Sequence, residues 1–194
     1  MKLILGTAEF GPTPYGTAKE PIALAEIDGI LKMAHHAGIE ILEGAESYKC
    51  DAVLQNPKFD IIYKVQSPFS LDRILGRINK SHLMGLLYHH TYETKGQMPY
   101  NDIRVIYRGS SVYKHQQILG SEEMIEVPLN LENREFEHTF APVKIVRSVF
   151  GRGELLKKYT IKECLDFVKS NPTVHGVVIG VNSKQELEEI LKNW

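Results

Sequence analysis

Cysteine is scarce in this sequence, and the two that occur, Cys50 and Cys164, lie far apart. They fit no CxxC pattern, so neither a zinc knuckle nor a redox pair is indicated. Two free thiols in a reducing cytosol are a simpler interpretation than a disulfide bond. Of the eight histidines, the pairs His35–His36 and His89–His90 are adjacent, so their side chains diverge in a regular element, and no HExxH motif occurs. We therefore expect no metal site.

Charge of one sign is not in excess either, since Lys and Arg number 23, Asp and Glu number 24, and the net charge is −1. Nucleic-acid-binding proteins usually carry a basic excess, so that class is disfavoured. Long apolar runs are missing too: the longest stretches are strand-sized, far short of the ~20 residues of a membrane span. The opening MKLILGTAEFG reaches Gly6 and Glu9 before a signal peptide's apolar region could form. We expect no targeting segment, no membrane contact and a cytoplasmic location.

Short apolar runs recur along the whole chain. Most are continuous rather than alternating, which is typical of parallel strands covered by helices. The predicted strands are Lys2–Leu5, Ile39–Leu42, Asp60–Val65, Leu83–Tyr88, Ile103–Tyr107, Met124–Pro128, Val143–Val149 and Gly176–Ile179.

Helical patterns lie between several of these runs. The predicted helices are Ile22–Ala37, Leu71–Lys80, Thr160–Lys169 and a last helix that starts at Ser183. Gly38 follows the first as a stop signal, and Ser183 with Glu186 predicts a capping box for the last.

Strand–helix alternation repeated to eight strands predicts the α/β class and a single closed (β/α)₈ barrel domain over residues 1–194. Such barrels typically take about 250 residues, so this one is shortened. The shortage lies in two links, residues 89–102 and 129–142, which follow the fourth and sixth strands and lack a helical stripe. We expect irregular crossovers there.

Polar residues at the carboxyl ends of the strands mark the active-site mouth of such a barrel. Glu43 and Tyr48 follow the second strand, Lys64 is near the end of the third, and His89 follows the fourth. An acid, a tyrosine, a lysine and a histidine thus come from three successive strand ends. Singly, each has a plain structural interpretation, such as a packed tyrosine or a salt-bridged lysine.

These residues, in this order, resemble the aldo/keto reductase family. The likeness includes LILGTAEFG in the first strand and EGAESY after the second. It continues through GSSVY, IEVPLNLENREFE, VRSVFGRGELL and VVIGVNSKQELEEIL, in register over essentially all 194 residues. It is closest to the branch associated with spore-coat or surface-polysaccharide biosynthesis.

The resemblance implies reduction of a small aldehyde, ketone or keto-sugar by hydride from a nicotinamide. Tyr48 would protonate the developing alkoxide, and Lys64 would lower the tyrosine's pKa from its usual value of about 10. Glu43 would hold Lys64 in place, and His89 would orient the substrate carbonyl. The substrate loops look trimmed, so a partner chain in a homo-oligomer could complete the pocket.

The same resemblance implies a set of cofactor-binding residues. They are Ser111 and Glu126 near the nicotinamide, Ser148, Arg152 and Gly153 after the seventh strand, and Gly180, Val181, Asn182, Ser183 and Gln185 at the eighth. The helix that opens at Ser183 offers free N–H groups to a phosphate, although Ser183 could equally be a simple cap. We expect NADP(H) in preference to NAD(H), but the last helix has no clear counterpart of the basic residues that read a 2′-phosphate. Lys184 is the nearest, so NAD(H) stays open as the alternative.

Some positions depart from the family pattern. The family's aspartate is Glu43, its strand-six glutamine is Glu126, and the glutamine of its LQG segment is Arg152. These departures keep a second hypothesis open, a non-catalytic barrel that binds a nucleotide or sugar or acts as a partner protein. A third is a Schiff-base lyase using Lys64, which the presence of Tyr48 and His89 disfavours.

Overall fold

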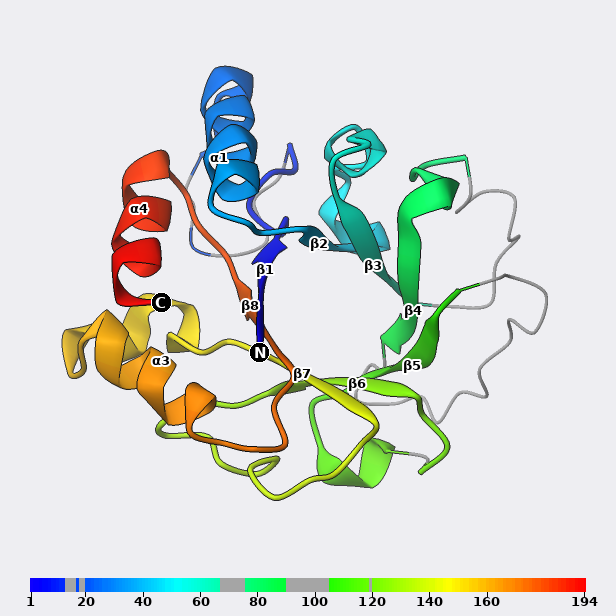
Figure 1. The fold of residues 1–194 in the computed structure, drawn as a ribbon, viewed down its shortest axis with the longest axis vertical. Helices are drawn as coiled ribbons and strands as arrows, with labels where there is room; N and C mark the ends of the chain where they lie inside the picture. The colour runs from blue at the N-terminus through cyan, green and yellow to red at the C-terminus, as the bar shows by residue number, and fades with distance from the viewer. Residues whose placement is uncertain (13–16, 18–19, 67–75, 90–104, 119) are drawn as a thin grey trace.

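The computed structural model describes residues 1–12, 17, 20–66, 76–89, 105–118 and 120–194. Eight parallel strands form a closed barrel in sequence order, and β8 pairs with β1 to close it (Figure 1). The predicted (β/α)₈ barrel is therefore confirmed. The strands are β1 Lys2–Gly6, β2 Ile41–Ala45, β3 Asp60–Val65, β4 Leu83–His89, β5 Tyr107–Ser111, β6 Met124–Pro128, β7 Val143–Arg147 and β8 Gly176–Ile179.

Three strands, β3, β6 and β8, have the predicted bounds, and β1 and β4 extend one residue further. Strand β2 begins two residues later than predicted and continues to Ala45, while β7 ends at Arg147 rather than Val149. Apolar runs thus locate these strands but not their carboxyl ends, because the polar site residues that end them interrupt the apolar pattern.

The predicted fifth strand, Ile103–Tyr107, was wrong. The strand lies four residues later, at Tyr107–Ser111, and Ile106 precedes it; residues 103 and 104 lie outside the described residues. Its sequence YRGSS contains only one apolar residue, so no apolar run marks it. Small residues are needed instead, because a Cβ at Gly109 would lie 1.6 Å from the carbonyl oxygen of Met124 on β6.

Among the described residues, three α-helices cover one side of the barrel, with α4 packed against both α1 and α3 (Figure 1). They are α1 Leu24–His36, α3 Ile161–Lys169 and α4 Lys184–Asn193. Gly38, at φ 81°, follows the first as predicted, in a conformation that favours glycine. Within the described ranges, no helix is long and apolar enough to cross a membrane.

The start of α4 differs from the predicted capping box in one respect. The Ser183 hydroxyl accepts the N–H of Glu186 across 3.2 Å, as a cap should. The Glu186 carboxylate, however, accepts the N–H of Asn182 across 2.7 Å rather than that of Ser183. The reciprocal half of the box is therefore displaced by one residue.

The helix predicted over Leu71–Lys80 lies partly outside the described residues, which omit 67–75. Residues 76–79 form turns, and Lys80 begins the 3₁₀ turn η3 Lys80–His82, so the described part of this prediction is wrong. Of the two links expected to lack helices, residues 90–102 are also outside the described residues.

The second link, residues 129–142, contains turns and no helix, as predicted. Two side chains hold it. Asn130 accepts the N–H groups of Glu132 and Asn133, and the buried Lys144 ammonium donates to the Phe136 carbonyl across 3.0 Å.

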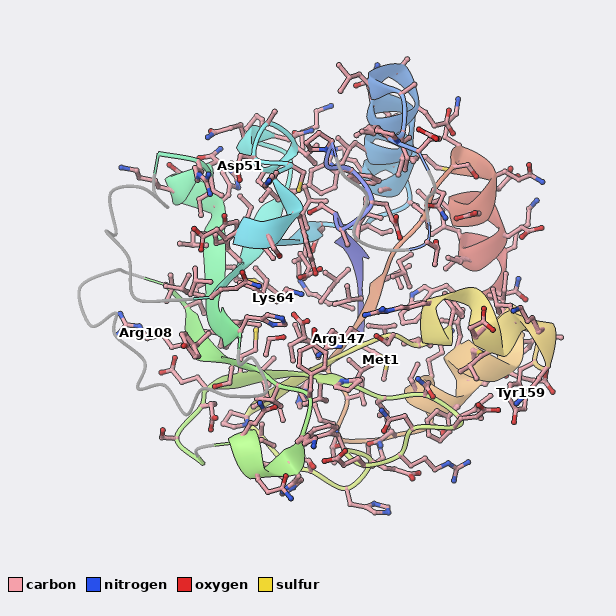
Figure 2. All side chains as sticks on the ribbon, turned by 180° about the vertical axis from the view of Figure 1, so that it is seen from behind. Met1, Asp51, Lys64, Arg108, Arg147 and Tyr159 are labelled. Carbon is pink, nitrogen blue, oxygen red and sulfur yellow. The ribbon has the colours of Figure 1, made fainter. Side chains whose placement is uncertain are left out.

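The barrel interior is built in layers, because alternate residues of a strand point to the same side. The lower layer is apolar and consists of Ile4, Ile41, Ile62, Leu87, Met124, Ile145 and Val178. Two residues further along the strands lie Gly6, Glu43, Lys64, His89, Ser111, Glu126, Arg147 and Gly180. Figure 2 shows Lys64 and Arg147 inside the ring of strands, whereas Asp51 and Tyr159 lie at the periphery. A polar layer therefore rests on an apolar base.

Candidate active site

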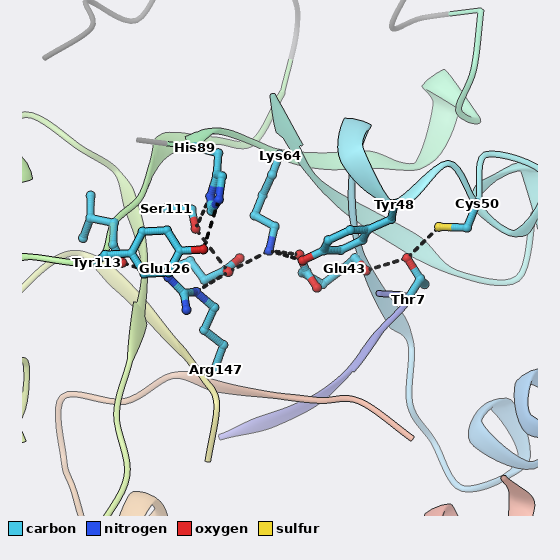
Figure 3. A network of polar contacts seen from close by, with 11 residues as sticks. Thr7, Glu43, Tyr48, Cys50, Lys64, His89, Ser111, Tyr113, Glu126 and Arg147 are labelled. Carbon is cyan, nitrogen blue, oxygen red and sulfur yellow. Dashed lines mark hydrogen bonds and ion pairs between the residues drawn. The ribbon is translucent and has the colours of Figure 1, made fainter. Parts of the chain in front are cut away.

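Three of the predicted catalytic residues meet at the ammonium of Lys64 (Figure 3). Lys64, from β3, forms an ion pair with Glu43 of the neighbouring strand β2. Its Nζ also donates to the hydroxyl of Tyr48 across 2.9 Å. Tyr48 ends the 3₁₀ turn η1 Glu46–Tyr48 directly after β2, which carries its hydroxyl back over the barrel mouth. Of the four side chains predicted to converge as a catalytic cluster, Glu43, Tyr48 and Lys64 are thus in direct contact, and their catalytic roles stay a prediction.

A second carboxylate reaches the same ammonium from the far side of the barrel. Glu126 on β6 has Oε1 3.0 Å from Lys64 Nζ and 3.1 Å from Arg147 Nε. Glu126 is fully buried, and its second oxygen has no hydrogen-bond partner among the described residues. Two buried anions and two cations therefore alternate in one network.

His89 joins this network through Ser111 rather than directly. His89 Nδ1 lies 3.1 Å from the Ser111 hydroxyl, which donates to Glu126 across 3.2 Å. The other ring nitrogen, Nε2, lies 3.3 Å from the hydroxyl of Tyr113. Strand register explains the arrangement, since His89 pairs with Ser111 and Ser111 pairs with Glu126 on successive strands.

The electrostatics of the buried ions depend on their neighbours. Burial acts to lower the pKa of Lys64, but the carboxylates of Glu126 and Glu43 outweigh it and raise that pKa well above 10.5. Burial raises the pKa of Glu43 to about 7, against the opposing pull of Lys64. For Glu126, burial acts upward, yet Lys64 and Arg147 together lower the pKa. Glu126 is thus the firmly ionised carboxylate, and Glu43 is the one that titrates.

The pKa of Tyr48 is raised, so the prediction that Lys64 lowers it overall was wrong. Burial is the main cause, and the negative charge of Glu43 adds to it. Lys64 does favour the tyrosinate, but burial and the negative charges of Glu43 and Glu126 together outweigh it. Tyr48 therefore holds its proton firmly at neutral pH.

A cavity of about 610 Å³ opens above this network, within the size range of ligand sites. Glu43, Tyr48, Lys64 and His89 all line it, and it extends towards α4. Gly6 and Gly180 also line it, and a Cβ at Gly180 would meet no atom within 4 Å. The cavity is therefore open at Gly180, whereas a Cβ at Gly6 would lie 3.3 Å from Glu43 Oε2.

Only some of the predicted cofactor-binding residues reach the cavity. Five line it: Ser148, Arg152, Gly153, Gly180 and Asn182. Ser111 and Glu126 are instead buried in the network beneath it, and Val181 is buried in the apolar core. Ser183 and Gln185 lie at the start of α4 and do not line the cavity.

The N-terminus of α4, where a phosphate was expected, is occupied by the chain's own acids. Glu26 on α1 accepts the backbone N–H of Lys184 across 2.7 Å, and its other oxygen lies 3.6 Å from Lys184 Nζ. The lysine stem lies over Gly29, where a Cβ would be only 2.7 Å from Lys184 Cδ. Lys184 is therefore held against α1 rather than presented to the cavity.

Sequence analysis missed two residues of the site, Tyr113 and Arg147. Arg147 ends β7, lines the cavity and lies over the Tyr113 ring, with the guanidinium carbon 4.3 Å from the ring centroid. Arg147 also donates to the carbonyl of Val112. The signal for Arg147 was present, because it is a charge at the end of an apolar strand.

The two cysteines are free and buried, in agreement with the sequence-based interpretation. Thr7 donates to the Glu43 carbonyl and lies 3.0 Å from Cys50 Sγ, so Cys50 supports the strand that carries Glu43. Burial raises the pKa of Cys50 to about 11, which keeps this thiol protonated and unreactive.

No protein-family model matches the sequence, and no curated protein matches it. Solved structures do match over 98% of the chain. A proposed aldo-keto reductase from Pseudomonas aeruginosa superimposes with a TM-score of 0.78 at 18% identity, over 88% of its own length. An aldo/keto reductase from Klebsiella pneumoniae, solved with NADP and acetate, gives 0.72 at 14% identity over 84% of its length. A proposed 2,5-diketo-D-gluconic acid reductase B gives 0.66 at 14% identity over 81%.

These comparisons define the fold. The chain has the closed parallel barrel of the aldo-keto reductases, as the sequence resemblance predicted. The likeness to the spore-coat branch stays a prediction.

Proposed function

We propose that this protein is an oxidoreductase of the aldo-keto reductase family that reduces an aldehyde, ketone or keto-sugar with a nicotinamide dinucleotide. One observation carries the proposal: Tyr48, Lys64 and Glu43 are joined by direct polar contacts beneath a cavity that His89 also lines. Neighbours with this fold include a complex with NADP, which supports a nicotinamide as the hydride source.

The chain's own residues would manage the charge that develops on the substrate oxygen. Tyr48 is protonated at neutral pH and can give its proton to that oxygen as an alkoxide forms. Lys64 donates to the same hydroxyl and would stabilise the tyrosinate that remains. Glu43 and Glu126 hold Lys64 in place. The raised pKa of Tyr48 makes it a weaker acid than the sequence-based prediction of a lowered pKa implied.

Two parts of the cavity wall are suited to hold a dinucleotide, the segment after β7 and the open space at Gly180. Ser148 and Arg152 are non-glycine residues at φ 58°, in the segment that lines the cavity wall after β7. Strained backbone of this kind is common at ligand sites. We infer that this segment and the open space at Gly180 would hold the dinucleotide, and that the bound nicotinamide would supply the hydride.

The preference between NAD(H) and NADP(H) follows from the other end of the cavity. Glu26 accepts the backbone N–H of Lys184 and forms an ion pair with its ammonium. Glu186 lines the cavity beside Asn182. Carboxylates repel a 2′-phosphate and can accept a hydrogen bond from a 2′-hydroxyl. These contacts favour NAD(H), against the preference for NADP(H) expected from the sequence resemblance.

The decisive experiment is a titration of NADH and NADPH against the folded protein, followed by nucleotide fluorescence, and then a carbonyl-reduction assay. We expect saturable binding and turnover that Tyr48→Phe reduces by about 10²-fold or more. Dinucleotide affinity should change less than about twofold, because the hydroxyl acts mainly in the transition state. Tyr107→Phe, a tyrosine on β5 outside the cavity lining, is the matched control.

The non-catalytic barrel is the second candidate, and the occupied helix start at Lys184 favours it. Failure of both dinucleotides to bind at millimolar concentration to folded protein would establish it in place of the enzyme. The Schiff-base lyase loses support, because the raised pKa of Lys64 keeps its amine protonated and non-nucleophilic.

A further inference from the structure

His89 meets a hydroxyl group at each of its two ring nitrogens. Nδ1 lies 3.1 Å from Ser111 Oγ, and Nε2 lies 3.3 Å from Tyr113 Oη. A hydroxyl can donate or accept, so these two distances alone leave both neutral tautomers of the imidazole open. The tautomer depends instead on Glu126, which contacts Ser111 rather than His89 itself.

The hydroxyl hydrogen of Ser111 already takes part in another hydrogen bond. Ser111 Oγ donates to Glu126 Oε1 across 3.2 Å, and both residues are fully buried. Glu126 is flanked by the cations Lys64 and Arg147, so it is ionised and can only accept. Because a hydroxyl has a single hydrogen, Ser111 presents a lone pair to His89 Nδ1. Nδ1 must then carry a hydrogen of its own.

We propose that Glu126 is a positioning residue that acts through Ser111 to hold His89 in the tautomer with its hydrogen on Nδ1. Nε2 is then the nitrogen without a hydrogen whenever His89 is neutral, and the Tyr113 hydroxyl donates to it. In the neutral ring, Nε2 accepts a hydrogen bond from a hydroxyl. Only the doubly protonated ring donates from Nε2 to a carbonyl oxygen.

This assignment rests on the proposed function for its catalytic meaning. With His89 neutral and held in this tautomer, Nε2 can accept a hydrogen bond from a product alcohol but cannot donate one to a carbonyl oxygen, which leaves the Tyr48 hydroxyl as the donor. Among the described residues, the charged and titratable groups that the polar contacts connect to His89 are Tyr113 after β5, Glu126 on β6 and, through Glu126, Lys64 on β3 and Arg147 on β7.

The direct test is long-range ¹H–¹⁵N NMR of the histidine side chains in the protein without dinucleotide. The His89 signal is assigned by its loss in His89→Gln. Five proteins are compared at a pH where His89 is neutral: wild type, Ser111→Ala, Glu126→Ala, Glu126→Gln and Ser110→Ala. Ser110 is the matched control, since it is equally buried on the same strand but hydrogen-bonds Glu122 instead.

We expect the Nδ1–H tautomer in wild type, in Ser110→Ala and in Glu126→Gln, because the glutamine amide oxygen can still accept from Ser111. In Ser111→Ala and in Glu126→Ala this preference should be lost, and an unchanged tautomer in Glu126→Ala would show that Glu126 does not position His89. An Nε2–H tautomer in wild type would overturn the proposal. An unchanged tautomer in Ser111→Ala would also overturn it, since Tyr113 alone would then set the ring. The measurement needs no activity. An inactive protein with the Nδ1–H tautomer would therefore refute the proposed function but leave the role of Glu126 and Ser111 in positioning His89 intact.

Discussion

Lys64 and Glu126 face each other across the barrel interior, from β3 and β6, with Nζ 3.0 Å from Oε1. The negative charges of this carboxylate and of Glu43 therefore oppose the effect of the ammonium on Tyr48. Together with burial, which is the main cause, they explain why a tyrosine beside an ammonium still has a raised pKa.

Replacing Glu126 by glutamine should lower the pKa of Tyr48, because one of the two negative charges that oppose tyrosinate formation is removed. The shift is measured as the difference between ultraviolet tyrosinate titrations of Glu126→Gln with and without Tyr48→Phe. The same pair in the wild-type background gives the reference. An unchanged titration would show that Glu126 does not act on Tyr48.

Lys64→Met should lower stability by about 3–5 kcal/mol, because it leaves buried carboxylates without their ammonium. Carbonyl reduction should also be lost, and the optimum of any residual rate should move to higher pH. Lys144→Met is the matched control: Lys144 is another fully buried lysine, but it donates to backbone carbonyls away from the cavity. It should destabilise the protein while leaving turnover per folded molecule intact. Denaturant unfolding and turnover number separate the two effects.

Glu43 should make stability depend on pH. Its pKa rises from 4.5 to about 7 on folding, so the native state binds its proton more tightly than the unfolded chain. This stabilisation is fully present below about pH 4.5 and is lost as the pH rises through about 7. At about 1.4 kcal/mol for each pKa unit, the change is of the order of 3 kcal/mol.

The measurement is the free energy of unfolding from pH 5 to pH 8 in wild type and Glu43→Gln. The wild type should lose stability relative to the variant across this range, and parallel curves would contradict the assignment. Glu43→Asp should preserve or raise activity, since it restores the residue found in the resembling family.

Glu26→Gln should raise the affinity for NADPH relative to NADH. The substitution removes the charge that holds the Lys184 ammonium and weakens the bond to its backbone N–H. We expect a gain of about five- to tenfold for NADPH, about 1 kcal/mol, and little change for NADH. Asp28→Asn on the same helix is the control, because Asp28 pairs with the exposed Lys32 instead. Fluorescence titration of both nucleotides measures the ratio, and an equal effect of the two variants would refute the role of Glu26.

The sequence predicted the barrel and the meeting of Glu43, Tyr48 and Lys64, because both follow from strand order. It misplaced β5, where a close approach to Met124 selects Gly109 and small residues instead of apolar ones. Ser111 and Glu126, which it assigned to the cofactor, are buried and do not line the cavity, and their cofactor role stays a prediction. The pKa of Tyr48 depends on burial and on the charges of Glu43 and Glu126, and neither can be deduced from spacing along the chain.

The apolar layer under the polar layer fills the barrel interior on the side away from the cavity. Below Lys64 and Glu126 the interior is filled by aliphatic side chains such as Ile62 and Ile145, which can neither carry nor accept a proton. Among the described residues, the cavity and not this apolar layer therefore offers the network a route for protons. A ligand bound there would block proton exchange between the network and solvent. The network would then keep its protonation state for as long as the ligand stays bound.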